Sequence, residues 1–192
     1  MGNVVVGMTV SLDGFINDGD GSLSALYSDF DDLQNAELMK ESIRNTGAVV
    51  MGWKTFNMAK DLDSYAVDYE YQVPIFVVTH ALPLRHPKEN DKLKIFFVTD
   101  GLESAIASAK QAAQKLDVTV VGGAKIIQQC LAKKLANELQ IDVMPILLGN
   151  GQRLFDGSVT LDLKLKKPAC VITPAGRTHF AFLLSEQQGS HR

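Results

Sequence analysis

Apolar and polar positions along the chain follow two periods, one typical of buried strands and one typical of helices. Short runs rich in β-branched and aromatic residues predict strands at residues 4–10, 47–51, 74–79, 93–99 and 118–121. Stripes with a helical period predict helices from about Asp31 to Arg44, from about Leu102 to Lys115 behind an N-cap at Asp100, and from residue 124 to about residue 135. This alternation predicts an α/β protein with a mostly parallel sheet.

The last third of the chain has a different pattern. Leu139, Ile141 and Val143 alternate with polar residues as far as Pro145, which predicts a half-buried strand. Residues 161–165, 170–172 and 178–184 predict antiparallel strands near the edge of the sheet, with one wet face. Because neither an internal repeat nor a linker interrupts the chain, we expect residues 1–192 to form a single domain.

Composition narrows the class of protein. The chain has 192 residues, 46% of them hydrophobic, and a net charge of −3, which provides no basic field for nucleic acid or anionic lipid. No apolar run approaches the roughly 18 residues of a membrane span. The first residues lack the pattern of a signal peptide, and Cys130 and Cys170 lie inside predicted elements, where thiols behave as small hydrophobic groups. We therefore expect a cytoplasmic protein with no nucleic-acid or membrane partner.

The turn after the strand at 118–121 is a candidate anion site. Gly122-Gly123 joins this strand directly to a predicted helix that carries Ile126 on its inner face. Free N–H groups and the positive end of the dipole at a helix start favour an anion such as a pyrophosphate, and glycine lets the phosphate approach the backbone. A tight turn without a ligand is the alternative interpretation.

Beyond that helix, the order GGA…NEL.I.VMPILLGNGQRLF at residues 122–155 resembles the closing half of the dihydrofolate-reductase-like fold. The version it resembles is shared by bacterial "dihydrofolate reductase family" proteins and by the C-terminal reductase domain of the riboflavin-pathway deaminase/reductase. The resemblance extends from Val5 to about Leu183. It implies a three-layer α/β domain with a mostly parallel mixed sheet and antiparallel C-terminal strands, NADPH as cofactor, a small-molecule substrate, and a homodimer with a candidate interface near residues 144–155.

The resemblance also implies which residues meet the cofactor. The stretch at 11–16, SLDGFI, resembles the signature that follows the family's first strand, although a plain turn at Asp13-Gly14 is the alternative. The stretch at 52–56, GWKTF, departs from the family's G-R-x-T-[WY], because Trp53 replaces the usual arginine and Lys54 supplies the cation one position later. This change puts a preference for NADPH over NADH in question, and Trp53 is a candidate for stacking on adenine.

The implied cofactor set lies on the ends of several predicted strands, which we expect to meet at the carboxyl edge of the sheet. For the nicotinamide it comprises Met8, Thr9 and Ile16, for the phosphates and adenosine Gly52, Trp53, Lys54, Thr55, Thr79 and His80, with Arg85 as a further candidate, and for the pyrophosphate Gly122, Gly123, Ala124, Lys125 and Ile126. In relatives the peptide between the two glycines is often cis.

The catalytic candidate is an aspartate. Folate reductases carry a carboxylate near the start of the first helix, where this chain has Asp29, Asp31 and Asp32. We prefer Asp32, because it can point inward one turn after the cap, although the helix dipole alone favours acidic residues there. Residues 17–23 are interpreted as a mobile lid loop and not as a calcium site, because the EF-hand spacing of ligands is missing, and no metal site is predicted.

Together these features predict an NAD(P)H-dependent reductase that transfers hydride to a small heterocyclic or carbonyl substrate, with pterin- or folate-like compounds among the options. One alternative is a riboflavin-pathway 5-amino-6-(5-phosphoribosylamino)uracil reductase. Against it stands Val121, because those enzymes commonly carry glutamate directly before the glycine pair. A second alternative is a non-catalytic dimeric binding protein of the same fold.

Overall fold

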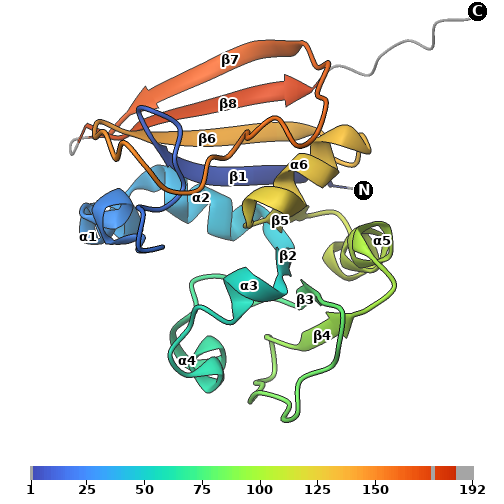
Figure 1. Cartoon of the computed structure of the whole chain (residues 1–192). Helices are drawn as coiled ribbons and strands as arrows, with labels where there is room; N and C mark the ends of the chain where they lie inside the picture. The colour runs from blue at the N-terminus through green and yellow to red at the C-terminus, as the bar shows by residue number, and fades with distance from the viewer. Residues whose placement is uncertain (1, 174–175, 185–192) are drawn as a thin grey trace, which may run out of the picture.

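The computed structural model describes residues 2–173 and 176–184, and they form one eight-stranded sheet with helices on both faces (Figure 1). The order across the sheet is β4-β3-β2-β5-β1-β6-β8-β7. The strands are β1 (Val4–Ser11), β2 (Thr46–Gly52), β3 (Ile75–Val78), β4 (Ile95–Val98), β5 (Asp117–Val120), β6 (Glu138–Met144), β7 (Leu165–Ile172) and β8 (Thr178–Leu184).

Strand directions divide the sheet into two parts. Strands β1 to β6 run parallel to one another, whereas β8 is antiparallel to β6 and β7 is antiparallel to β8. The central register pairs Val6 with Val120 on one side of β1 and Thr9 with Asp142 on the other. The predicted mostly parallel mixed sheet with antiparallel C-terminal strands is therefore confirmed.

Helices cover the two faces unequally. The helices are α1 (Phe30–Asn35), α2 (Glu37–Asn45), α3 (Trp53–Phe56), α4 (Tyr65–Asp68), α5 (Leu102–Ala113) and α6 (Ala124–Ala132), with short 3₁₀ helices at Ser24–Tyr27 and Leu62–Ser64. On one face, α5 and α6 pack on alternate residues of β1 such as Val4 and Val6. On the other, Met39 and Ile43 of α2 pack against a core cluster that contains Val49 of β2.

The expectation of a single helix over residues 31–44 is wrong. Helix α1 ends at Asn35 and α2 begins at Glu37, because Ala36 between them is extended, with φ −65° and ψ 140°. The side chain of Asn35 donates a hydrogen bond to the carbonyl of Asp31. Asparagine often ends a helix in this way, because its amide competes with the next backbone hydrogen bond.

Two other boundaries differ from the prediction. Gly101, and not Asp100, is the N-cap of α5, and its φ of 109° is a conformation that glycine adopts without strain. Only Leu165 of the predicted strand at 161–165 lies in a strand, at the start of β7. Leu161 and Leu163 instead pack against the core on the α6 side, which explains their alternation without a strand pair.

Candidate functional site

The carboxyl ends of β1, β2 and β5 meet at the glycine pair, as the sequence predicts. The amide of Gly52, at the end of β2, donates to the carbonyl of Gly122 over 3.0 Å. A Cβ on Gly122 would lie 2.9 Å from the methyl carbon of Met8, and one on Gly123 would lie 3.4 Å from the hydroxyl of Thr55. A Cβ on Gly52 would lie 3.1 Å from Ile126. Met8, Thr55 and Ile126 therefore pack closely against these three glycines, whose bare backbone we call the glycine cradle, and a larger residue would clash with them.

The glycine pair itself has an unusual backbone. The peptide between Gly122 and Gly123 is cis, and Gly122 has a φ of 106°, where other residues are strained. Gly123 is the N-cap of α6, and the first amides of a helix have no partner within the helix. Ala124 is buried there, while Lys125 is exposed. This end of α6 therefore combines close backbone approach with free donors, which suits a pyrophosphate.

The side chains expected near the adenosine have different partners. Trp53 is half-buried, and its ring centroid lies 6.0 Å from that of Phe56 and 6.2 Å from that of Phe97. The hydroxyl of Thr79 donates to the carbonyl of Ala81, so it belongs to a local turn.

The charged candidates on the same side of the molecule also differ in what they contact. Arg85 donates two hydrogen bonds to Asp63, at 3.0 and 3.2 Å, so its guanidinium is already paired. Lys54 and His80 are both exposed. Of the cationic candidates here, Lys54 is therefore the one best suited to a phosphate.

Asp13 of the SLDG stretch does more than form a turn. Ser11 donates to its carboxylate over 2.6 Å, and the amides of Gly149 and Leu148 donate to it over 2.8 and 3.2 Å. The hydrogen bond from Ser11, together with those from the two amides, lowers the pKa of Asp13 to about 2. The carboxylate thus fastens the segment that follows β6 to the end of β1.

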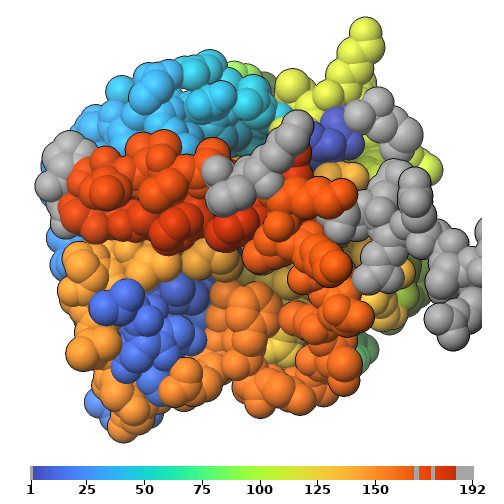
Figure 2. Space-filling view, turned by 90° about the horizontal axis from the view of Figure 1, so that it is seen from above, coloured from blue at the N-terminus to red at the C-terminus, as the bar shows by residue number. Residues whose placement is uncertain are grey.

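The loop after β1 is joined to the same segment. Ile16 donates through its amide to the carbonyl of Gln152, and its side chain is buried in the core on the α6 side. The side chain of Asn17 accepts from the amide of Gln152. In Figure 2 the blue surface of this loop adjoins the orange surface of the chain after β6. The mobility of a lid at residues 17–23 stays a prediction, while its first residue is anchored.

A cleft of about 590 Å³ opens on the sheet face that carries α1 and α2. It begins at Met8, Thr9 and Val121, next to the glycine pair, and extends across β6 and β8. Ligand sites in proteins commonly have volumes of about 300–1,000 Å³. The sequence did not predict the floor of this cleft, because its residues come from strands that are far apart along the chain.

One end of the cleft is closed by a buried ion pair. Arg177 is fully buried, and it donates to both carboxylate oxygens of Asp29, at 2.9 and 2.6 Å. It also donates to the hydroxyl of Thr9 at 3.0 Å and to the carbonyl of Leu26 at 2.9 Å. Its hydrogen bonds to Asp29 lower the pKa of that carboxyl, so Asp29 is ionised and fully engaged near neutral pH.

The expectation that Asp32 points inward is wrong. Asp31 and Asp32 are exposed in the first turn of α1, and Asp29, just before the helix, is the aspartate that faces the interior. Successive residues of a helix point about 100° apart, so the start of α1 at Phe30 decides which carboxylate turns to solvent. Asp29 pairs with a residue 148 positions later, which no local sequence pattern reports.

Asp142 and His179 form a second polar pair in the cleft. They lie on β6 and β8, and Nδ1 of His179 is 2.9 Å from a carboxylate oxygen of Asp142. Because an ionised carboxylate only accepts, Nδ1 carries the proton in this hydrogen bond. The other oxygen of Asp142 lies 3.9 Å from Arg177. Sequence reasoning treated both residues as ordinary strand positions and missed the pair.

Comparison with known protein families identifies the family of this chain. A family model described as the RibD C-terminal domain matches residues 3–171. The chain belongs to the RibD C-terminal domain family. This family is one of NAD(P)H-dependent reductases with a dihydrofolate-reductase-like fold, so the fold and the resemblance stated above are confirmed.

Individual relatives place the chain within the RibD C-terminal domain family. The chain is 26% identical over 172 residues to the uncharacterized protein YwjB of Bacillus subtilis. This match covers 84% of this chain and 87% of YwjB. The structure of a candidate riboflavin biosynthesis protein from Shewanella sp. PV-4 matches with a TM-score of 0.78 at 26% identity, over 96% of this chain and 99% of that one.

Two more distant structures share the fold alone. The riboflavin biosynthesis reductase Rib7 of Saccharomyces cerevisiae matches with a TM-score of 0.59 at 17% identity, over 96% of this chain and 89% of that one. Dihydrofolate reductase of Enterococcus faecalis, in complex with NADP(H), matches with a TM-score of 0.63 at 11% identity, over 96% of this chain and 97% of that one. The sheet of this RibD C-terminal domain is thus the one on which both enzymes are built.

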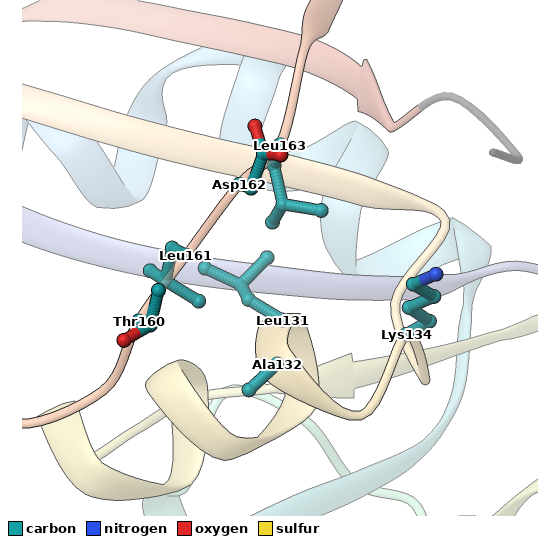
Figure 3. A pocket seen from close by; sticks show the side chains of 7 residues that line it. All are labelled: Leu131, Ala132, Lys134, Thr160, Leu161, Asp162 and Leu163. Atoms are coloured by element: carbon teal, nitrogen blue, oxygen red, sulfur yellow. The ribbon is translucent and has the colours of Figure 1, made fainter.

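A second hollow of this RibD C-terminal domain lies at the other end of α6 (Figure 3). It measures about 170 Å³ and lies between Leu131, Lys134 and residues 160–163. That volume is below the range of common ligand cavities, and the glycine pair lies at the opposite end of the helix. We therefore place the functional site at the glycine pair and the cleft beside it.

Within residues 2–173 and 176–184, no group of three or more His, Cys, Asp or Glu side chains could hold a metal ion. None of the helices in this part of the chain is long and apolar enough to cross a membrane.

Proposed function

We propose that this protein is an NAD(P)H-dependent reductase that transfers hydride to a small heterocyclic or carbonyl substrate in the cleft on the α1/α2 face. The observation that carries the proposal is the position of Met8. Its side chain touches the glycine cradle on one side and lines the cleft on the other, so a cofactor over the glycines and a substrate in the cleft would meet there.

The residues of the cradle fit a dinucleotide. The backbone of Gly122 and Gly123 and the first turn of α6 would hold the pyrophosphate, and the hydroxyl of Thr55 lies close enough to Gly123 to assist. Exposed Lys54 would meet the 2′-phosphate as a point charge. When bound, the cofactor supplies the hydride. The protein's part is to orient the two reactants and to exclude water.

Asp29 is not the proton donor in this proposal. Its carboxyl is ionised and accepts a hydrogen bond from Arg177 at each oxygen, so it has no proton to give. The role that the resemblance gave to an acidic residue near the first helix therefore becomes structural here, because Asp29 and Arg177 together close the end of the cleft.

A titration with NADPH tests the proposed function. Trp53 is the single tryptophan of the chain and follows Gly52 directly, so binding should quench or shift its fluorescence. We expect saturable binding of NADPH, followed by oxidation of NADPH when a panel of pterins, flavin precursors and small carbonyl compounds is supplied. Absence of a signal at millimolar cofactor would contradict the proposal and favour the non-catalytic binding protein.

Family membership favours one narrower candidate, a 5-amino-6-(5-phosphoribosylamino)uracil reductase of riboflavin biosynthesis. Against it stands Val121, which lines the head of the cleft where those enzymes commonly carry glutamate. The same oxidation assay with 5-amino-6-(5-phosphoribosylamino)uracil decides between this candidate and an enzyme with another substrate.

A further inference from the structure

The lining of the cleft is acidic. Five carboxylates line it, and none of the described residues along it is lysine or arginine. They are Glu41 of α2, Glu70 between α4 and β3, Asp117 of β5, and Glu138 and Asp142 of β6. Like charges placed opposite one another across an interface repel, so these carboxylates together disfavour an anionic ligand in the cleft, although burial raises the pKa of Glu70 and weakens its share.

The guanidinium at the end of the cleft is not available to an anion. Four hydrogen bonds from Arg177 reach Asp29, Thr9 and Leu26, and arginine has five N–H donors in all. The side of the guanidinium that donates to Thr9 also faces Asp142 at 3.9 Å. A phosphate would therefore have to displace a buried, hydrogen-bonded carboxylate to reach this cation.

His179 supplies the polar group that is directed at a ligand. It lines the cleft, its side chain is 6% exposed, and Nδ1 is held by Asp142. No described residue makes a hydrogen bond to Nε2. In the neutral imidazole with a proton on Nδ1, Nε2 is an acceptor. The carboxylates of the cleft are acceptors, as is Nε2 when the ring is neutral, so the complementary ligand is one that donates N–H or O–H hydrogen bonds.

The wall opposite this floor is apolar. Phe30 and Leu33 of α1 and Leu38 and Met39 of α2 face the cleft. A flat ring can pack against aromatic and aliphatic side chains on one side while its edge donates to the floor. The volume of the cleft, its apolar wall and its acceptor-rich floor all favour the same class of ligand, a flat ring that donates hydrogen bonds.

We propose that the cleft binds a neutral or cationic heterocycle that carries no phosphate and donates hydrogen bonds to His179 and Asp142, and that it discriminates against phosphorylated ribosylaminopyrimidines. This inference rests on the proposed function, because it makes the cleft the substrate side of the reductase. It separates this chain from family members that reduce a 5-phosphoribosylamino substrate.

Binding measurements without turnover test the proposal. One pair of probes is 5-amino-6-ribosylaminouracil and its 5′-phosphate, and a second pair is 2,4-diaminopyrimidine, a donor-rich base, and orotate, an anionic pyrimidine. We expect the uncharged riboside and the diamine to bind at least about tenfold more tightly than their anionic counterparts in calorimetric titrations. Equal or tighter binding of the phosphate or of orotate would overturn the proposal, and so would a lack of binding by all four probes at millimolar concentration.

Substitutions test whether the preference against anionic ligands arises in the cleft. His179→Phe keeps a flat ring and removes the acceptor, so the affinity for diaminopyrimidine should fall about tenfold. Glu41→Lys, at an exposed position of α2, should raise the affinity for orotate. Asp91→Lys makes the same charge change at an exposed position outside the cleft and should leave both affinities unchanged. If Asp91→Lys matches Glu41→Lys, the cleft is not where the charge acts.

The outcome is separable from that of the proposed function. Folding of each variant is checked by its urea midpoint, and NADPH binding is followed independently through Trp53. Probe selectivity without NADPH binding would refute the reductase and leave the cleft as a ligand site. NADPH binding with no preference against anions would refute the ligand class and leave the reductase.

Discussion

At the scale of single residues, two carboxylates that a sequence reader would assign to turns or catalysis hold the site together. Asp13 fastens the segment after β6 to the end of β1, and Asp29 neutralises the buried Arg177. Neither is free to act on a substrate. Their substitution should therefore be felt first in stability and in the shape of the cleft.

Replacement of Arg177 by methionine should destabilise the fold strongly. The change leaves the carboxylate of Asp29, 5% exposed, without its partner, and removal of one member of a buried ion pair costs about 3–5 kcal/mol. Arg44→Met is the matched control, because the Arg44–Glu37 pair is exposed and such pairs contribute about 0–1 kcal/mol. Urea unfolding measures both, and similar losses for the two variants would contradict the role of the buried pair. Asp29→Leu combined with Arg177→Met should recover much of the loss.

The contribution of Asp13 should depend on pH in a defined window. Its folded pKa of about 2 is lower than the ordinary value of 3.8, so its stabilising effect is complete above about pH 4 and is lost as the pH falls toward 2. We expect Asp13→Asn to be less stable than the parent chain at pH 6, with a difference that shrinks between pH 4 and 2. Unfolding free energies at several pH values measure the difference, and a constant gap across the window would show that the carboxylate charge is not what matters.

At the scale of elements, the pattern of the chain predicts what local sequence decides. The alternating strands and helices, the glycine pair before α6 and the meeting of three strand ends follow from periodicity and turn residues, and the structure has them. The break at Ala36 was missed because helical periodicity continues through it. The Asp29–Arg177 and Asp142–His179 pairs were missed because each joins residues from different elements. Tertiary pairing of polar groups leaves no local signal.

The glycine cradle gives a prediction at this scale. Gly122→Ala places a Cβ 2.9 Å from Met8 at a residue with a φ of 106°, so NADPH should bind at least about tenfold more weakly. Gly149→Ala is the control, because Gly149 also has a positive φ, of 74°, but has no atoms within 4 Å of the added carbon. It should cost stability and spare cofactor affinity. Titration of Trp53 fluorescence compares the two, and equal losses of affinity would show that the cradle is not the phosphate site.

The segment between β2 and β3 contains Lys54, the residue that tests the preference for NADPH over NADH. Lys54, in α3, is the exposed cation next to the position where relatives have arginine. Lys54→Gln should weaken NADPH binding by about three- to tenfold at low ionic strength and leave NADH binding unchanged, because only NADPH carries the 2′-phosphate. The same fluorescence titration, repeated with added salt, checks this. An equal effect on both cofactors would place Lys54 at the pyrophosphate instead.

At the scale of the whole molecule, the two halves of the sheet form different parts of the candidate site. The parallel half, with β1, β2 and β5, ends in the glycine cradle, and the antiparallel extension, with β6 and β8, supplies the polar floor of the cleft. Strand β1 belongs to both, because it pairs with β5 on one side and β6 on the other. If the proposed function holds, substitutions in β6 and β8 should change ligand preference and leave the glycine cradle as it is.

We also propose that the protein is a homodimer that associates through residues 144–155. Leu147 is 72% exposed in this segment and Phe155 is 46% exposed, and Asp13 holds the backbone of the segment in place. Sedimentation should give a mass of about twice the 20.9 kDa of the chain. Leu147→Glu should shift the mass toward that of the monomer, because a charge buried without a partner opposes association.

Leu84→Glu is the control for this last prediction, because Leu84 is fully exposed but lies between β3 and β4, outside the proposed interface. It should leave the dimer intact. Dissociation by Leu84→Glu and not by Leu147→Glu would move the interface to the β3–β4 side. A monomer in the parent chain would remove the dimer without affecting the reductase, because the cradle and the cleft are both built from residues of one chain.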